Sequence, residues 1–174
     1  NWIANEMLKM TKGNPKYILI SLAFFTAIVS AFLDNVTTVI LIMPVTFVIA
    51  KELDINPIPF LITEILASNI GGTATLIGDP PNIIIGSAAG LSFMDFIKEL
   101  TGIVAAILIV NVGLLTFIFR KQLVAAKEKM EKVAQLDNSH TITDKALMIR
   151  SGIVLLLVII GFMLHDITHI QTCV

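Results

Sequence analysis

The chain has 174 residues, of which 56% are hydrophobic and only 14% are charged, and its mean hydropathy is +0.89. Because a soluble domain carries about a quarter charged residues, this composition predicts an integral membrane protein with the lipid bilayer as its main partner. The 12 Lys and Arg residues are balanced by 13 Asp and Glu residues, which excludes the basic surface that nucleic acid binding requires.

Two apolar runs, at 17–33 and 35–50, come first along the chain and are joined directly through Asp34. As helices rising about 1.5 Å per residue, each run would span about 25 Å, close to the ~30 Å hydrocarbon core of a bilayer. Two structures are therefore open for the segment 15–53. Either both runs cross the membrane and meet in a solvated turn, or they form a re-entrant hairpin with a polar tip near the bilayer centre, made of Asp34, Asn35, Thr37 and Thr38.

The next apolar segment, 57–97, is interrupted near its middle by the run GDPPN at 78–82. The glycine of this run is typical of a helix end, Asp79 of an N-cap, and the first proline of the first position in a new helix. The positive-inside bias favours a single interrupted crossing, because that arrangement puts eleven of the twelve Lys and Arg residues on one face and leaves only Lys98 on the other. The pattern predicts one broken transmembrane helix.

Non-helical backbone survives inside a bilayer only where it is buried in protein or lines a wet cavity. In the first half of the broken helix, Glu64, Ser68, Gly71 and Thr75 share one face, which suits either such a cavity or close helix packing through small residues. The N-terminus of the restarted helix would favour an anion or polar ligand. The backbone carbonyls left unpaired at the end of the first half would favour a cation. Intramembrane acids tend to pair, bind a cation or carry a proton, so the candidate coupling groups are Asp34, Asp79 and, nearer the cytoplasmic end, Glu64.

A full transmembrane helix is expected at 100–119, followed by a cytoplasmic linker at 120–146 that includes a short amphipathic helix. A further transmembrane helix at 147–165 is expected to begin the second half of the protein. No signal peptide opens the chain, so we expect the 174 residues to be a fragment of one membrane domain.

Two stretches, AFLDNVTTVILIMPV at 31–45 and PFLITEILASNIGGTATLIGDPPNIIIG at 59–86, carry a family resemblance. They resemble the arsenite/anion permeases, the sodium-proton antiporters of that type and the melanosomal P protein, within the ion transporter superfamily of citrate transporter-like domains. The resemblance implies an all-α membrane protein with two inverted repeats, each containing a re-entrant hairpin and a discontinuous helix that meet at mid-membrane. It favours the re-entrant structure for 15–53 and implies that this chain holds one half of the fold.

The resemblance also implies a site. The hairpin tip would contribute Asp34, Asn35, Thr37 and Thr38, and the unwound region would contribute Asn69, Gly71, Gly72, Thr73, Thr75, Gly78, Asp79 and Asn82. Relatives that carry dicarboxylates read Ser-Asn-Thr at the tip, whereas this chain reads Asp34-Asn35-Val36-Thr37. That departure argues against a sodium site of their type and favours proton coupling through Asp34.

The leading functional hypothesis is a secondary active transporter for a small inorganic ion or anion such as arsenite, coupled to a sodium or proton gradient by alternating access. The alternatives are a sodium-proton antiporter and a passive anion channel. An enzyme is not expected, because the intramembrane aspartyl protease pattern Gly-x-Gly-Asp lacks its first glycine at 76–79. We expect no cofactor and no metal site beyond a bound sodium ion or proton. The expected location is a bacterial or archaeal plasma membrane, the missing second repeat would complete the site, and a homodimer is an open alternative for the assembly.

Overall fold

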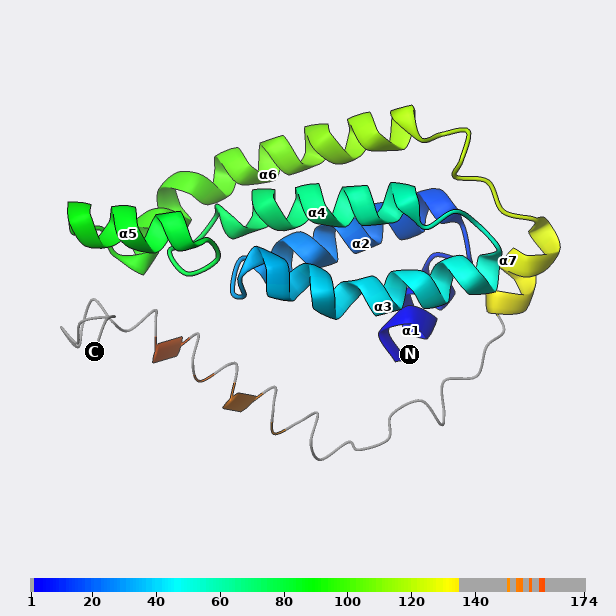
Figure 1. Cartoon of the computed structure of the whole chain (residues 1–174), viewed down its shortest axis with the longest axis horizontal. Coiled ribbons are helices and arrows are strands. Elements are labelled where there is room, and N and C mark those ends of the chain that lie inside the picture. The colour runs from blue at the N-terminus through cyan, green and yellow to red at the C-terminus, as the bar shows by residue number, and fades with distance from the viewer. Residues whose placement is uncertain (1, 135–149, 151–152, 155–156, 158–159, 162–174) are drawn as a thin grey trace.

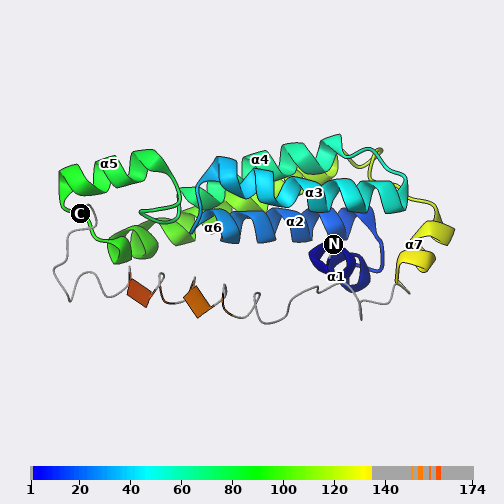
Figure 2. The ribbon, with the colours of Figure 1, turned by 60° about the horizontal axis from the view of Figure 1, so that its bottom comes forward.

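The computed structural model describes residues 2–134, 150, 153–154, 157 and 160–161, and between residues 2 and 134 it contains helices and no strands. Four helices lie side by side along the long axis, while α1 and α7 gather at one end and α5 extends past the other (Figures 1 and 2). The helices are α1 (Trp2–Met10), α2 (Pro15–Ser30), α3 (Asn35–Leu53), α4 (Ile58–Gly72), α5 (Pro80–Ala89), α6 (Phe93–Ile118) and α7 (Lys127–Ala134).

Helices α2 and α3 form an antiparallel hairpin whose ends are set by local hydrogen bonds (Figure 1). Asn14 caps α2 by accepting a hydrogen bond from the backbone N–H of Lys16 at 3.1 Å, and Pro15 occupies the first turn. After Ser30 the chain turns within four residues, and α3 starts at Asn35. The tip of this hairpin lies beside the non-helical segment 73–79 that separates α4 from α5 (Figure 1).

The interruption after α4 begins earlier than the sequence pattern predicted. Helix α4 ends at Gly72, six residues before the glycine of the GDPPN run, so Thr75 lies beyond the helical face to which we assigned it. Pro80 lies in the first turn of α5, as predicted, and Asp79 stands at the N-cap position. The Asp79 carboxylate makes no capping hydrogen bond, however, so the prediction that it caps α5 is wrong: it accepts a hydrogen bond from Asn35 instead.

The boundary between the second half of the broken helix and the next span also differs from the prediction. Helix α5 ends at Ala89, where Gly90 adopts a left-handed backbone with φ +65°. Helix α6 starts at Phe93 because Ser92 and Asp95 form a capping box with each other's backbone N–H groups. Residues 93–97 therefore belong to the long helix α6, and not to the broken helix that was predicted over 57–97.

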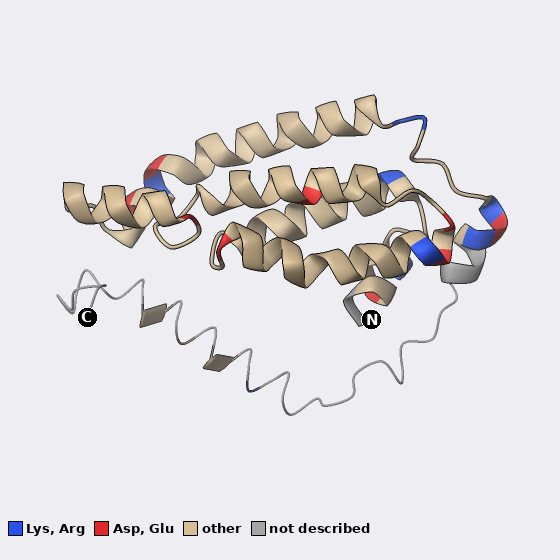
Figure 3. Cartoon of the chain, in the orientation of Figure 1, with Lys and Arg blue, Asp and Glu red and all other residues tan. Residues whose placement is uncertain are grey.

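The outer surface of the bundle is apolar along the length of the helices. Helices α3 and α6 are each long and apolar enough to cross a membrane, whereas the apolar helices α2 and α4 are shorter. Large hydrophobic side chains stay exposed on α6, among them Ile107, Val110 and Phe117. Lys, Arg, Asp and Glu gather mainly near the ends of the long helices (Figure 3). The exposed apolar faces support the composition-based prediction of an integral membrane protein, and the described residues form helices and no strands, in line with the all-α fold that the resemblance implies.

Helices α1 and α7 close the base of the hairpin. Leu8 from α1 and Leu123, which precedes α7, are buried in one apolar cluster with Leu53 and Phe60. Lys129 of α7 forms an ion pair of 2.6 Å with Asp54 at the end of α3. The sequence analysis missed α1, whereas α7 lies inside the linker at 120–146 for which a short helix was predicted. The rest of the predicted linker and most of the span at 147–165 lie outside the described residues.

Candidate ion and substrate site

The site is built where four helix ends meet, at the hairpin tip and the segment 73–79. Helices α2 and α4 end there with their free carbonyls, and α3 and α5 begin there with their free N–H groups. The macrodipoles therefore bring two positive and two negative helix ends to one region of the bundle, on the side of α5 (Figure 1). Such a region can hold an anion and a cation next to each other without any charged side chain.

Asn35 joins the elements of this site. Its Nδ2 atom donates to Asn69 Oδ1 and to Asp79 Oδ1, both at 3.2 Å, and its Oδ1 atom accepts from the hydroxyl of Ser30 at 2.8 Å. One half-buried amide thus connects the hairpin tip to the last turn of α4 and to the start of α5. Asn35, Asn69 and Asp79, all predicted site residues, are brought together by these hydrogen bonds.

The segment 73–79 is held by its own set of polar contacts. The hydroxyl of Thr75 donates to the backbone carbonyl of Ala31 at the hairpin tip and accepts from the N–H of Gly78 at 3.1 Å. The side-chain amide of Asn82 donates to the carbonyls of Thr73 and Thr75, at 3.3 and 2.9 Å. Backbone groups freed by the interruption therefore find partners inside the protein, as a non-helical segment within a membrane requires.

The glycines of the site serve close packing. A Cβ atom on Gly71 would lie 2.5 Å from the Cα of Ala27 on α2, and one on Gly72 would meet the side chain of Asn35 and lie 2.8 Å from the carbonyl oxygen of Gly78. A Cβ on Gly78 would in turn lie 2.7 Å from the carbonyl oxygen of Ser30. Of the two readings open for Gly71, the structure therefore supports helix packing. At Gly72 and Gly78 the missing side chains let the segment 73–79 lie against the hairpin tip and the end of α4.

Three hairpin residues, and Thr73 at the start of segment 73–79, have different surroundings from those of Asn35. Asp34 is exposed and caps α3, since its Oδ1 accepts from the backbone N–H of Thr37 at 3.0 Å. The side chain of Thr37 is exposed, whereas Thr38 is fully buried and its hydroxyl has no hydrogen-bond partner within the described part of the chain. Thr73 is exposed and donates to the carbonyl of Asn69 at 2.9 Å.

Glu64 lies apart from the tip. It is fully buried, and the hydrogen bond that the structure gives its carboxyl group comes from Thr46 of α3. Local reasoning did not find Thr46, nor Ser30, whose hydroxyl holds Asn35 in place. The sequence contained one signal that could have identified Ser30, namely a hydroxyl side chain in the last turn of an apolar helix next to the predicted hairpin tip.

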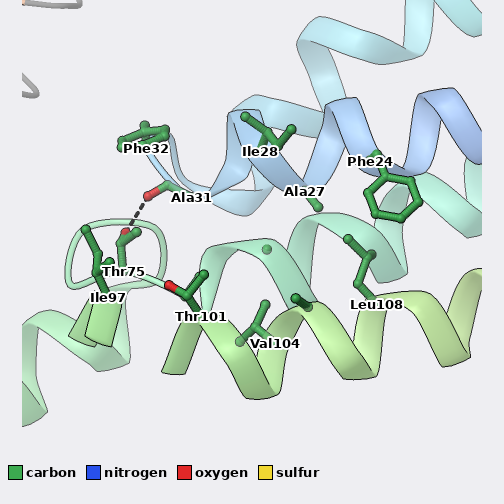
Figure 4. Close-up of a pocket in the computed structure, with 13 residues that line it drawn as sticks. Phe24, Ala27, Ile28, Ala31, Phe32, Thr75, Ile97, Thr101, Val104 and Leu108 are labelled. Carbon is green, nitrogen blue, oxygen red and sulfur yellow. Dashed lines mark hydrogen bonds between the residues drawn. The ribbon is translucent and has the colours of Figure 1, made fainter. Parts of the chain in front are cut away.

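Two hollows flank the tip and differ in chemistry. A groove of about 250 Å³ between α3 and α4 is lined by Asn35, Ser68 and Asn69 together with aliphatic side chains. A larger cavity of about 390 Å³ lies between α2, the segment 73–79 and α6, where Thr75 points to Ala31 (Figure 4). The lining of the larger cavity is almost entirely apolar, whereas the smaller groove includes the polar side chains of Asn35, Ser68 and Asn69.

These features define an integral membrane protein with a polar cluster inside an apolar helical bundle. The model of the citrate transporter family matches residues 1–174, and the chain belongs to this family. The resemblance stated from the two sequence stretches is confirmed, since the human P protein is 36% identical over 145 residues, covering 80% of this chain and 17% of that protein.

Two mycobacterial relatives are more similar. A 46 kDa membrane protein of Mycobacterium leprae is 46% identical over 168 residues, which is 97% of this chain and 39% of that protein. An uncharacterized transporter of Mycobacterium tuberculosis is 46% identical over 163 residues, covering 94% of this chain and 38% of that protein. The chain therefore spans about two fifths of the length of these relatives.

Proposed function

We propose that the protein containing this chain is a secondary active transporter for a small inorganic ion or anion, of which arsenite is an example, and that it works by alternating access. The observation that carries this proposal is the set of hydrogen bonds made by Asn35. They join the hairpin tip to the end of α4 and to the start of α5 in one polar cluster. Paired broken elements of this kind form solute sites in secondary transporters, with helix N-termini facing anions and unwound carbonyls facing cations.

The charges of the half-site support coupling to a cation. The segments 31–38 and 67–82 contain Asp34 and Asp79 but no Lys or Arg. Two carboxylates attract a proton or a sodium ion, and they repel a weakly charged oxyanion far less than a multiply charged organic anion such as citrate. This same observation favours the second candidate function, a sodium-proton antiporter.

The proposed architecture is one inverted repeat in which α2 and α3 form a re-entrant hairpin and α4 and α5 form a discontinuous transmembrane helix. Two observations support it. The tip of the hairpin ends beside segment 73–79, short of the far end of the molecule, and α5 continues beyond it (Figure 1). The second repeat, outside this chain, would then supply the other half of the site in a bacterial or archaeal plasma membrane.

Reconstitution of the full-length protein into proteoliposomes tests this function. Uptake of arsenite and of sodium is measured while the sodium and pH gradients are imposed separately. We expect Asp34→Asn to alter ion dependence, because asparagine still caps α3 but carries no charge. We expect Asn69→Ala to abolish coupled uptake, because it removes a partner of Asn35.

Glu99→Gln is the matched control, since Glu99 is exposed near the start of α6, away from the site, and should transport as wild type. Both site variants must insert into the membrane as wild type does, so that a change in uptake or ion dependence reflects the site and not misfolding. Wild-type uptake and coupling in both of them, or no gradient-driven flux in the wild-type protein, would overturn the proposal. A leak faster than a carrier can turn over would indicate a channel instead.

A further inference from the structure

Glu64 forms a buried link between the two helices that carry the site. Its side chain is 0% exposed, and that of its partner Thr46 is 1% exposed. The Thr46 hydroxyl hydrogen-bonds Glu64 Oε1, while Glu64 Oε2 has no partner within the described part of the chain. Thr46 belongs to α3, which begins with Asn35, and Glu64 belongs to α4, which bears Asn69 one turn and a half later. The link and the site therefore share the same two helices.

No cation neutralises this carboxyl group among the described residues, where the ion pair found is the one between Lys129 and Asp54. Helices α2, α3 and α6 pack against α4, and their charged and titratable side chains lie toward their ends. They are Lys16 and Tyr17 on α2, the N-cap Asp34 with Lys51 and Glu52 on α3, and Asp95, Lys98 and Glu99 on α6. Because Glu64 is enclosed by this chain itself, the second half of the protein cannot reach it in this conformation.

The surroundings of Glu64 suit a proton better than a metal ion. An unpaired carboxylate is among the most expensive groups to bury, and within a membrane such acids pair, bind a cation or become neutral. A sodium ion would need several oxygen ligands, whereas the hydrogen-bond partner that the described residues give the Glu64 carboxyl group is the single hydroxyl of Thr46. A neutral acid leaves only a carbonyl or hydroxyl oxygen unsatisfied, which costs far less than an unsatisfied charge.

We propose that Glu64 holds a proton in this conformation and releases it to water only when the interface between α3 and α4 is hydrated, so that proton occupancy couples to the geometry of the site. The step is a simple dissociation: the O–H bond of the acid breaks, the proton passes to water, and the carboxylate remains facing the Thr46 hydroxyl. The charge left behind is costly to bury again, so it keeps α3 and α4 apart, and with them Asn35 and Asn69, until a proton returns. This inference rests on the proposed transport function and assigns its proton to Glu64 in place of Asp34 or Asp79.

Infrared difference spectroscopy on the full-length protein in lipid tests the proton directly. A protonated carboxylic acid has a carbonyl stretching band that a carboxylate lacks. We expect this band at neutral pH in wild type and its loss in Glu64→Gln, with no change in Glu52→Gln, whose parent side chain is exposed on α3. Thr46→Val should keep the band and shift its frequency, because the acid remains but loses its hydrogen-bond partner. An acid carbonyl band that is absent from wild type at neutral pH, or that is unchanged in Glu64→Gln, overturns the proposal.

Uptake as a function of pH tests the coupling. Glutamine is a neutral analogue of the protonated acid, so Glu64→Gln should retain substrate exchange but lose the pH dependence that wild type and Glu52→Gln share. Wild-type pH dependence in Glu64→Gln overturns the proposal while leaving the transporter function intact. If the wild-type protein shows no coupled uptake at all, the function fails, and the infrared band still decides whether Glu64 carries a proton.

Discussion

Replacing Gly71 by alanine tests how closely the hairpin must approach the interrupted helix. The added Cβ atom would lie 2.5 Å from the Cα and 2.6 Å from the carbonyl carbon of Ala27. Two carbon atoms prefer a separation of about 3.5–4.0 Å, so α2 and α4 must move apart by about 1 Å to admit the methyl group. Overpacking of this kind costs about 1–3 kcal/mol of stability.

The same displacement would reach the site, because Ala27 lies in the last turn of α2, eight residues before Asn35. The two hydrogen bonds from Asn35 Nδ2, to Asn69 and to Asp79, are already 3.2 Å long. A further 1 Å would bring them to about 4 Å, beyond the range in which a hydrogen bond contributes. We therefore expect Gly71→Ala to lose both stability and gradient-driven uptake.

Denaturant titration in detergent micelles measures the stability, and proteoliposome uptake measures the activity. Gly102→Ala and Gly113→Ala are matched controls on α6, because a Cβ atom at either position meets nothing within 4 Å. Both controls should stay within about 0.5 kcal/mol of wild type, as surface substitutions usually do. If Gly71→Ala unfolds and transports like these two variants, the inference that α2 and α4 require this contact is wrong.

Three further changes probe other contacts. Asn35→Asp would place a second carboxylate beside Asp79, so uptake should fall at neutral pH and recover in part as the pH is lowered; equal uptake at all pH values would contradict the role of the amide. Asn82→Ala removes the donor to two carbonyls of segment 73–79 and should cost about 1–3 kcal/mol in a denaturant titration, whereas an unchanged midpoint would mean that other donors replace it. The hydrogen bond and charge of Lys129 lower the pKa of the Asp54 carboxyl, so the tie to α7 should persist above the ordinary pKa of aspartate and be lost as the pH falls through the lowered value. Protection factors of the α7 amides, which are exchange rates corrected for their intrinsic pH dependence, should then fall at acid pH in wild type and already be low at neutral pH in Asp54→Asn. Protection that is the same in both proteins at every pH would argue against the tie.

Composition and local chemistry were sufficient for the class of the protein and for the restart of a helix near residue 80, but not for the ends of α4 and α5. An excess of apolar residues cannot be buried in a chain of this size, so the outer faces must meet lipid or other protein, as the exposed Ile107 and Val110 on α6 illustrate. Pro80 cannot donate the hydrogen bond of a helix interior, and that property alone predicts a restart near residue 80. The family likewise followed from two stretches of sequence.

Which polar residues act together was decided by the tertiary structure. Asn35 meets Asn69 and Asp79 across 34 and 44 residues of sequence, and no local periodicity records such a separation. The same packing covers Gly71 with Ala27 and turns the carboxylate of Asp79 from its expected cap toward Asn35. Glu64 has the same side chain as any exposed glutamate, and only the enclosure of its carboxyl group by neighbouring helices makes ionisation costly there. Burial and contact between distant segments are properties of the folded chain, because they depend on how whole helices pack and not on the order of residues within each of them.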